Sequence, residues 1–305
     1  MMNKLFERGL HRIKEARFTL QAHGVLDTPP LSTSGDDGLI IFSMIGTRVI
    51  VPYLVAAKSL YSQLKRGRFV ILDDGSLTPA DRDVLAHHLD NPPVLSIADI
   101  DSAPAPRGGC WERLFALLDL RRDAYVIQLD SDTVTLGPVP EIEAAIAAGR
   151  DFTLRGEAGS EWQPIGSFGS SVPVAADAHV QRAIEAVMDK AGAAMPAFSH
   201  YVRGCAGFAG FAPGGLGRDT CEQFCAVAAS LIGADRWAQW GSEQVMSNLL
   251  VANEGEPVLL PYDRYLNYWA EPFGQDAAFV HFVGTYRFHA GTYARAARRA
   301  IAAMR

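Results

Sequence analysis

The segment YVIQLDSDTVTLG, Tyr125–Gly137, places two aspartates directly after a run of residues that favours a buried strand. The run Tyr125–Leu129 predicts a strand inside the core of the protein. A carboxylate carried into such an environment costs several kcal/mol unless a cation or a hydrogen-bond donor meets it. We therefore expect a positively charged partner beside Asp130 and Asp132.

Short apolar strands alternate with helices around this segment. Strands are predicted over 39–44, 68–72, 93–97 and 125–129, and helices over 52–64, 110–120, 242–253 and from Thr78 onward. This alternation is typical of βαβ units that build a mainly parallel sheet. The sequence thus predicts an α/β, Rossmann-like single domain with helices on both faces of its central sheet.

The two aspartates lie two residues apart, so on an extended segment their side chains point to the same side. Ligands of open α/β sheets bind beyond the carboxyl ends of the strands, where Asp73 and Asp74 also fall. Hard carboxylate oxygens suit Mg²⁺ or Mn²⁺. The pattern therefore predicts a divalent-cation site at Asp130 and Asp132.

Two segments resemble motifs of the GT-A-fold glycosyltransferases, especially those of family eight. YVIQLDSDTVTLGPVPEI resembles the segment that carries the family's Asp-x-Asp motif, and HFVGTYR resembles its C-terminal H-x-x-G-x-x-K element. The resemblance implies that Asp130, Asp132 and His281 bind Mn²⁺ or Mg²⁺. It also implies that Gly284 and Arg287, the latter in place of the usual Lys, contact the diphosphate of a nucleotide sugar, expected to be UDP-linked.

Further segments are similar to the family in the same order. The resemblance implies donor-binding roles for residues along the N-terminal half, namely Thr47, Asp74, Arg113 and Ser131. SEQVMSNLL resembles the family's D-Q-x-x-x-N helix and places Gln244 near the reacting sugar carbon, so that Gln244 and Asp132 are the expected catalytic residues. GCAGFAGF resembles the family's F-N-A-G-V segment, with Cys205 at the Asn position.

The resemblance implies a metal-dependent transfer of a sugar from a nucleoside diphosphate to an acceptor, with retention of anomeric configuration. The acceptor is a glycan, a lipid or a small molecule. We expect an N-terminal amphipathic helix and linker over 1–38 and a GT-A domain over 39–305. That domain divides into a nucleotide-sugar-binding half, an acceptor half and a basic C-terminal helix, over 39–150, 151–290 and 291–305.

The net charge of −6 is unevenly distributed, with +3 on residues 1–20, +4 on residues 295–305 and −13 on the rest. The acidic body argues against a nucleic-acid partner. Because apolar residues interleave with the N-terminal bases, that helix either lies on an anionic membrane surface or packs on its own domain. With no apolar run long enough for a membrane helix and no signal-peptide core, we expect a cytoplasmic protein, either free or peripheral at the inner membrane surface.

Two other functions start from the same residues. VIQLDSDTV also matches the loop of haloacid-dehalogenase-type phosphatases, in which Asp130 would attack phosphorus and Asp132 would act as the acid. That superfamily's distal acidic pair would be Asp73 and Asp74, which here precede the loop instead of following it. A nucleotide-sugar-binding protein without catalytic activity is the other alternative.

Overall fold

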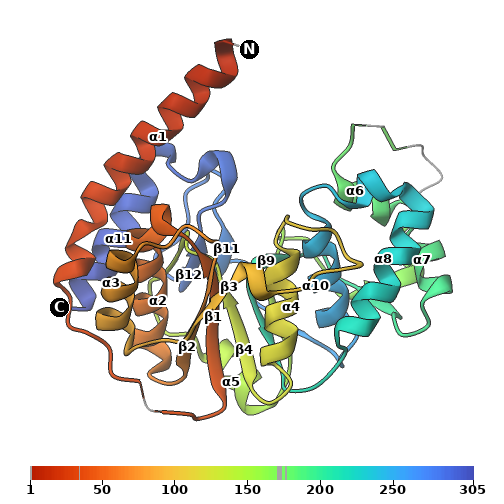
Figure 1. Cartoon of the computed structure of the whole chain (residues 1–305), viewed down its shortest axis with the longest axis horizontal. Coiled ribbons are helices and arrows are strands. Elements are labelled where there is room, and N and C mark those ends of the chain that lie inside the picture. The colour runs from red at the N-terminus through yellow and green to blue at the C-terminus, as the bar shows by residue number, and fades with distance from the viewer. Residues whose placement is uncertain (1, 34, 170–173, 176) are drawn as a thin grey trace.

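The computed structural model describes residues 2–33, 35–169, 174–175 and 177–305 (Figure 1). The helices are α1 Met2–Ala22, α2 Ile50–Leu64, α3 Pro79–Leu89, α4 Trp111–Leu120, α5 Pro140–Ala147, α6 Val180–Glu185, α7 Met188–Ala194, α8 Arg218–Ile232, α9 Ala234–Trp237, α10 Ser242–Ala252 and α11 Thr292–Ala303. The strands are β1 Leu39–Ile45, β2 Arg68–Asp73, β3 Val94–Ser96, β4 Tyr125–Leu129, β5 Thr133–Thr135, β6 Phe152–Arg155, β7 Gln163–Pro164, β8 His200–Tyr201, β9 Gly204–Phe211, β10 Val258–Leu259, β11 Tyr265–Asn267 and β12 Phe279–His281.

Within the described chain, the central sheet has seven strands in the order β10-β6-β9-β4-β1-β2-β3. The strands β3, β2, β1 and β4 pair in parallel, and β10 pairs in parallel with β6. Only β9 runs against its neighbours β4 and β6 in this sheet as described. The predicted α/β fold with a mainly parallel sheet is confirmed.

Helices cover both faces of the sheet (Figure 1). Successive residues of β1 point to opposite sides: Ile41 joins the core beneath α2, whereas Ile40 and Phe42 join the core beneath α4. A strand buried on both faces requires a nearly continuous apolar run, and 39–45 provides one with Ser43 as its polar residue. Among the helices of the described residues, none combines the length and apolar character needed to cross a membrane.

Several element boundaries differ from the sequence prediction by one or two residues. The strand predicted over 93–97 ends at Ser96, whose hydroxyl accepts a hydrogen bond from the backbone N–H of Ala98 and turns the chain into a 3₁₀ turn. The helix predicted from Cys110 begins one residue later, because Cys110 has a left-handed backbone with φ of 75°. The helix predicted over 52–64 begins at Ile50.

A smaller sheet was not predicted. In the part of the chain that the structure describes, it has three strands in the order β11-β12-β5. It joins a segment after β4 to two segments from the last fifth of the chain, with His281 in register with Thr133 on one side and with Asn267 on the other. This pairing brings the C-terminal H-x-x-G-x-x-R element to the Asp-x-Asp segment.

Candidate metal and donor site

The candidate site lies at the carboxyl edge of the central sheet. The chain order reverses between β1 and β4, since β2 and β3 lie on one side of β1 and β4 on the other. Such a reversal opens a crevice beyond the strand ends, and ligands of α/β sheets bind there. Asp130 directly follows β4, and its backbone N–H donates to the carbonyl of Gly207 on β9 at 2.9 Å. The Asp-x-Asp segment is thereby fixed at the strand-order reversal.

Asp130, Asp132 and His281 converge as the sequence predicted. One ligand atom from each lies within 4.8 Å of the others, and no other such group of His, Cys, Asp or Glu occurs among the described residues. The Nε2 atom of His281 lies 3.2 Å from Oδ1 of Asp132 and 3.9 Å from Oδ2 of Asp130. Asp132 and His281 are buried, whereas Asp130 is partly exposed.

The expected positive partners are two arginines. Arg113 on α4 donates from Nη1 to Oδ1 of Asp130 at 2.6 Å, and Arg287 forms an ion pair with Oδ2 of Asp132. Each carboxylate thus gives one oxygen to an arginine and directs the other toward His281. These ion pairs offset the free-energy cost of placing two carboxylates against the core.

Arg113 is buried and does not form a surface ion pair. Its side chain is 7% exposed, and its Nη2 atom lies 3.3 Å from both carboxylate oxygens of Glu243 on α10. Burial raises the pKa of Glu243, and Arg113 opposes that rise. Glu243 therefore holds the guanidinium in place against Asp130, a role that the sequence did not reveal.

The imidazole of His281 is oriented by its neighbours on β9 and β11. Its Nδ1 atom lies 2.9 Å from Oδ1 of Asn267 and 3.4 Å from Sγ of Cys205. When Nδ1–H donates to the amide oxygen, Nε2 is left with a lone pair directed at the two aspartates. A side chain at Gly207 would collide with the ring, because a Cβ there falls far inside contact distance of the imidazole carbon Cε1.

The electrostatics favour charged groups at the site. Burial alone would raise the pKa of Asp132, but His281 and Arg287 outweigh burial and lower it to about 2. Burial alone would lower the pKa of His281, but the interactions with Cys205 and Asp132 raise it well above its usual value. An anionic Asp132 facing a proton on Nε2 is the arrangement in which a divalent cation can replace that proton.

The donor set fits a divalent cation of the Mg²⁺ or Mn²⁺ type. Three atoms of this set have no arginine contact and face one another: Oδ2 of Asp130, Oδ1 of Asp132 and Nε2 of His281. Two carboxylate oxygens with one imidazole nitrogen suit Mn²⁺ better than a soft metal. Three protein ligands leave coordination positions for substrate oxygens.

The predicted donor-binding residues Thr47 and Asp74 lie next to each other at the same edge. The hydroxyl of Ser76 accepts from the backbone N–H of Thr47 at 3.1 Å and donates to Asp74 at 2.5 Å. Gly46 allows this approach, since a Cβ there would overlap the Asp74 carboxylate. Both Thr47 and Asp74 are exposed beyond β1 and β2 and accessible to a ligand.

Three further predicted residues surround the Asp-x-Asp segment. The carbonyl of Ser131 accepts a hydrogen bond from the hydroxyl of Tyr293 on α11 at 3.2 Å. Gly284 is exposed with a left-handed φ of 46°, and no atom lies within 4 Å of a Cβ placed on it. Gln244 contacts the backbone N–H of Ala206 at 3.4 Å and the amide of Gln181, so it borders β9 and does not contact the carboxylates.

The phosphatase alternative fits this geometry poorly. Asp73 accepts hydrogen bonds from the backbone of Gly75 and Leu77 and pairs with Arg82 at 2.5 Å, contacts that stabilise the turn after β2. β1 separates β2 from β4, so this acidic pair lies about two strand spacings from Asp130. That alternative also assigns no role to His281.

Two exposed aromatic rings lie close in sequence to residues of the site. Trp269 and Tyr286 are 49% and 43% exposed, and their ring centroids are 6.3 Å apart in an edge-to-face arrangement. Trp269 follows shortly after Asn267, and Tyr286 directly precedes Arg287. Both rings therefore lie on segments that contribute to the site.

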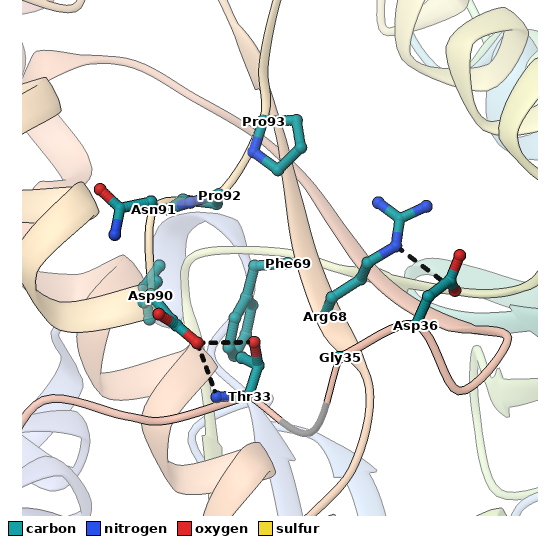
Figure 2. A pocket seen from close by; sticks show the side chains of 10 residues that line it. Thr33, Gly35, Asp36, Arg68, Phe69, Asp90, Asn91, Pro92 and Pro93 are labelled. Atoms are coloured by element: carbon teal, nitrogen blue, oxygen red, sulfur yellow. Dashed lines mark hydrogen bonds and ion pairs between the residues drawn. The ribbon is translucent and has the colours of Figure 1, made fainter.

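A separate hollow lies at the opposite edge of the sheet, where β2 begins (Figure 2). Its polar groups are paired with one another: Asp90 accepts from the backbone and hydroxyl of Thr33, and Arg68 lies 3.7 Å from Asp36. The residues that the figure labels place no His or Cys there. The carboxyl edge, where Asp130, Asp132 and His281 converge, is therefore the candidate functional site.

A parallel α/β sheet with an Asp-x-Asp segment beyond a central strand is the arrangement of the GT-A fold. Among solved structures, the galactosyltransferase LgtC in complex with donor and acceptor sugar analogues is similar, with a TM-score of 0.53 at 12% identity over 87% of this chain and 95% of that chain. An active-site glutamine-to-glutamate mutant of LgtC gives a TM-score of 0.50 at 13% identity over the same shares. No protein-family profile and no curated protein matches the sequence. The predicted GT-A fold is confirmed.

Proposed function

We propose that the protein is a metal-dependent glycosyltransferase that moves a sugar from a nucleoside diphosphate, expected to be UDP, to a hydroxyl acceptor with retention of configuration. The observation that carries this proposal is the convergence of Asp130, Asp132 and His281 at the strand-order reversal of a GT-A fold. Similar solved structures are those of a galactosyltransferase, which supports the reaction class.

In this proposal Asp130, Asp132 and His281 hold Mn²⁺ or Mg²⁺, which when bound neutralises charge on the diphosphate leaving group. Arg287 lies within reach of the same space, since its guanidinium already contacts Asp132. We expect it to turn its planar donor groups onto phosphate oxygens when the donor binds, because arginine matches that geometry with paired hydrogen bonds. Arg113 stays on Asp130 and holds that carboxylate in place.

The base and sugar of the donor then lie along the crevice on either side of the carboxylates. Thr47 and Asp74 are exposed beyond β1 and β2 and are proposed to contact the nucleoside. Gln244, on the β9 side, is proposed to position or stabilise the reacting sugar through its amide. No contact in the described structure directs a free carboxylate at that position, which agrees with a mechanism in which the acceptor itself attacks on the face that the leaving group vacates.

The acceptor side of the proposal rests on Trp269 and Tyr286. Exposed aromatic rings stack on the apolar face of a pyranose ring, and their desolvation favours binding. We therefore propose a sugar hydroxyl as the acceptor group, presented by a glycan or a glycosylated small molecule that stacks on these rings.

The test is the release of nucleoside diphosphate from a panel of nucleotide sugars, measured with Mn²⁺ and with a chelator. We expect slow hydrolysis of one donor that needs Mn²⁺ and falls at least about 100-fold in Asp132→Asn. Asp123→Asn, a change of an exposed aspartate before β4, is the matched control and should leave the rate unchanged.

Failure has distinct forms. A rate of nucleoside diphosphate release that changes neither with the chelator nor in Asp132→Asn would contradict the metal site. Metal-dependent hydrolysis of a general phosphatase substrate in place of nucleotide sugars would favour Asp130 as a nucleophile. Metal-dependent nucleotide binding without turnover of any donor and acceptor pair would favour the binding protein.

A further inference from the structure

The helix α1 has two apolar faces, and only one of them is covered. Phe18 and Ala22 are buried, and the ring of Phe18 stacks on Tyr293 of α11 with a centroid distance of 3.9 Å. Ile13 and Leu20 are 66% and 76% exposed. Ile13 and Leu20 are two helical turns apart and so share a face, which lies roughly opposite Phe18.

The N-terminal part of α1 extends away from the body of the molecule (Figure 1). The residues from His11 to Lys14 are all exposed, although these positions cover more than a full helical turn. An isolated helix of this kind is marginal in water, because helices gain most of their stability from packing an apolar face. A partner that covers Ile13 and Leu20 would remove that deficit.

The charge around this uncovered face is positive. Arg12 and Arg17 lie on either side of the line from Ile13 to Leu20, and Arg17 falls between them along the helix. Both arginines are exposed, and in the described contacts neither has an acidic partner. Glu15 is turned toward the body, where it pairs with Arg48. The described outer surface of α1 therefore presents bases with apolar side chains between them.

The neighbouring helix α11 also exposes basic residues. Its inner face is buried, whereas Arg295, Arg298 and Arg299 are exposed. No Asp or Glu follows Asp276 in the sequence, so α11 has no acid of its own to offset these charges. The two helices lie side by side (Figure 1), and Arg305 donates to the carbonyl of Gly24 at 3.3 Å.

We propose that the surface formed by Arg12, Ile13, Arg17 and Leu20 of α1, with the exposed arginines of α11, docks on an anionic lipid bilayer. Apolar side chains flanked by bases match the boundary between acyl chains and anionic headgroups. A nucleic acid offers phosphates but nothing to cover Ile13 and Leu20, so the apolar residues favour the bilayer. The helix lies in the interface and does not span it.

This docking surface is fixed relative to the candidate site. Phe18 stacks on Tyr293, and the hydroxyl of Tyr293 donates to the carbonyl of Ser131 between the two aspartates. Tyr293 also stacks on Phe282, whose backbone N–H donates to the carbonyl of Asp132 at 2.8 Å. A bilayer that holds α1 therefore holds the carboxyl edge of the sheet at a defined height above the lipid.

The test is co-sedimentation of the full chain with vesicles of phosphatidylcholine alone or mixed with phosphatidylglycerol. We expect binding to the anionic vesicles only, weakened as salt rises from about 0.1 M to about 1 M. Arg12→Gln and Arg17→Gln should each reduce partitioning roughly fivefold. Ile13→Ser with Leu20→Ser should reduce it further, whereas Ile13→Leu should retain it.

The matched control is Arg122→Gln, a change of an exposed arginine after α4, and it should bind as the unchanged protein does. Equal binding to neutral vesicles, or binding that the α1 variants leave intact, would overturn the proposal. So would a dimer in solution that Ile13→Ser dissociates, or binding to DNA in place of vesicles. The melting temperature of each variant shows that the fold is retained.

Discussion

The Nδ1 atom of His281 lies 2.9 Å from the side-chain oxygen of Asn267, and the two residues are register partners on β12 and β11. This contact sets which ring nitrogen faces Asp130 and Asp132. A histidine whose other nitrogen is held in this way is a better metal ligand than a freely rotating one. The geometry therefore ties the candidate metal site to the small sheet that the sequence did not predict.

Replacing Asn267 tests this orientation. We expect Asn267→Ala to weaken Mn²⁺ binding by about 10- to 100-fold, measured by calorimetric titration. Asn267→Asp keeps an acceptor for Nδ1–H but loses the amide donors to the carbonyls of Arg155 and Gly156. It should therefore retain metal affinity even where the melting temperature falls. An equal loss of Mn²⁺ affinity in both variants would mean that Asn267 has a structural role only.

Replacing Gly207 tests whether the imidazole of His281 needs the space that this glycine leaves free. A methyl group there would displace the imidazole of His281, so Gly207→Ala should weaken Mn²⁺ binding at least about tenfold. Gly159→Ala is the control, because no atom lies within 4 Å of a Cβ at that position. Equal Mn²⁺ affinities of the two variants would contradict the steric argument.

Trp269 tests the acceptor side of the proposed reaction. The substitution Trp269→Ala removes one stacking ring and should raise the KM for a sugar acceptor roughly two- to tenfold. Metal-dependent hydrolysis of the donor should stay unchanged, since the ring of Trp269 packs against Tyr286, which is not among the proposed donor-binding residues. The same substitution at Trp240, another exposed tryptophan, is the control. A loss of donor hydrolysis in Trp269→Ala would move this residue to the donor site.

Asp151 provides a stability test away from the site. Burial, together with the nearby Glu254, raises the pKa of Asp151 to about 7. Because the native state then holds a proton that the unfolded chain releases at lower pH, stability should fall as pH rises from about 4 to about 7 and then level off. Asp151→Asn should reduce this fall and raise the melting temperature at pH 8 by about 2 °C or more. An unchanged pH profile would contradict the assignment.

Much of the fold could be predicted because the first half of the chain is locally consistent. The strands predicted over 39–44 and 125–129 are mainly apolar runs, and strands of this kind alternate with helices of ordinary length along the first half of the chain. Asp130 and Asp132 could be named because they follow such a strand, whereas His281 could be named only from the resemblance of HFVGTYR to the H-x-x-G-x-x-K element. Asp130 and Asp132 come after β4, and His281 ends β12.

The rest depends on contacts between distant segments. The strands β5, β11 and β12 are too short to show a periodic pattern, so their pairing could not be predicted. Glu243 takes the Asp position of the D-Q-x-x-x-N motif that SEQVMSNLL resembles, and only the structure shows that it pairs with the buried Arg113. The need for Gly207 follows from packing against His281, which no local rule reveals. The donor's identity and the cytoplasmic location stay predictions.

The most direct test of the central claim is the affinity for Mn²⁺ measured by electron paramagnetic resonance, with and without UDP. We predict that UDP tightens Mn²⁺ binding and that Mn²⁺ tightens UDP binding by the same factor, because both would meet at one site. His281→Ala should abolish this coupling, whereas Arg122→Gln should preserve it. Mn²⁺ binding that is absent, or that is indifferent to both UDP and His281→Ala, would contradict the account.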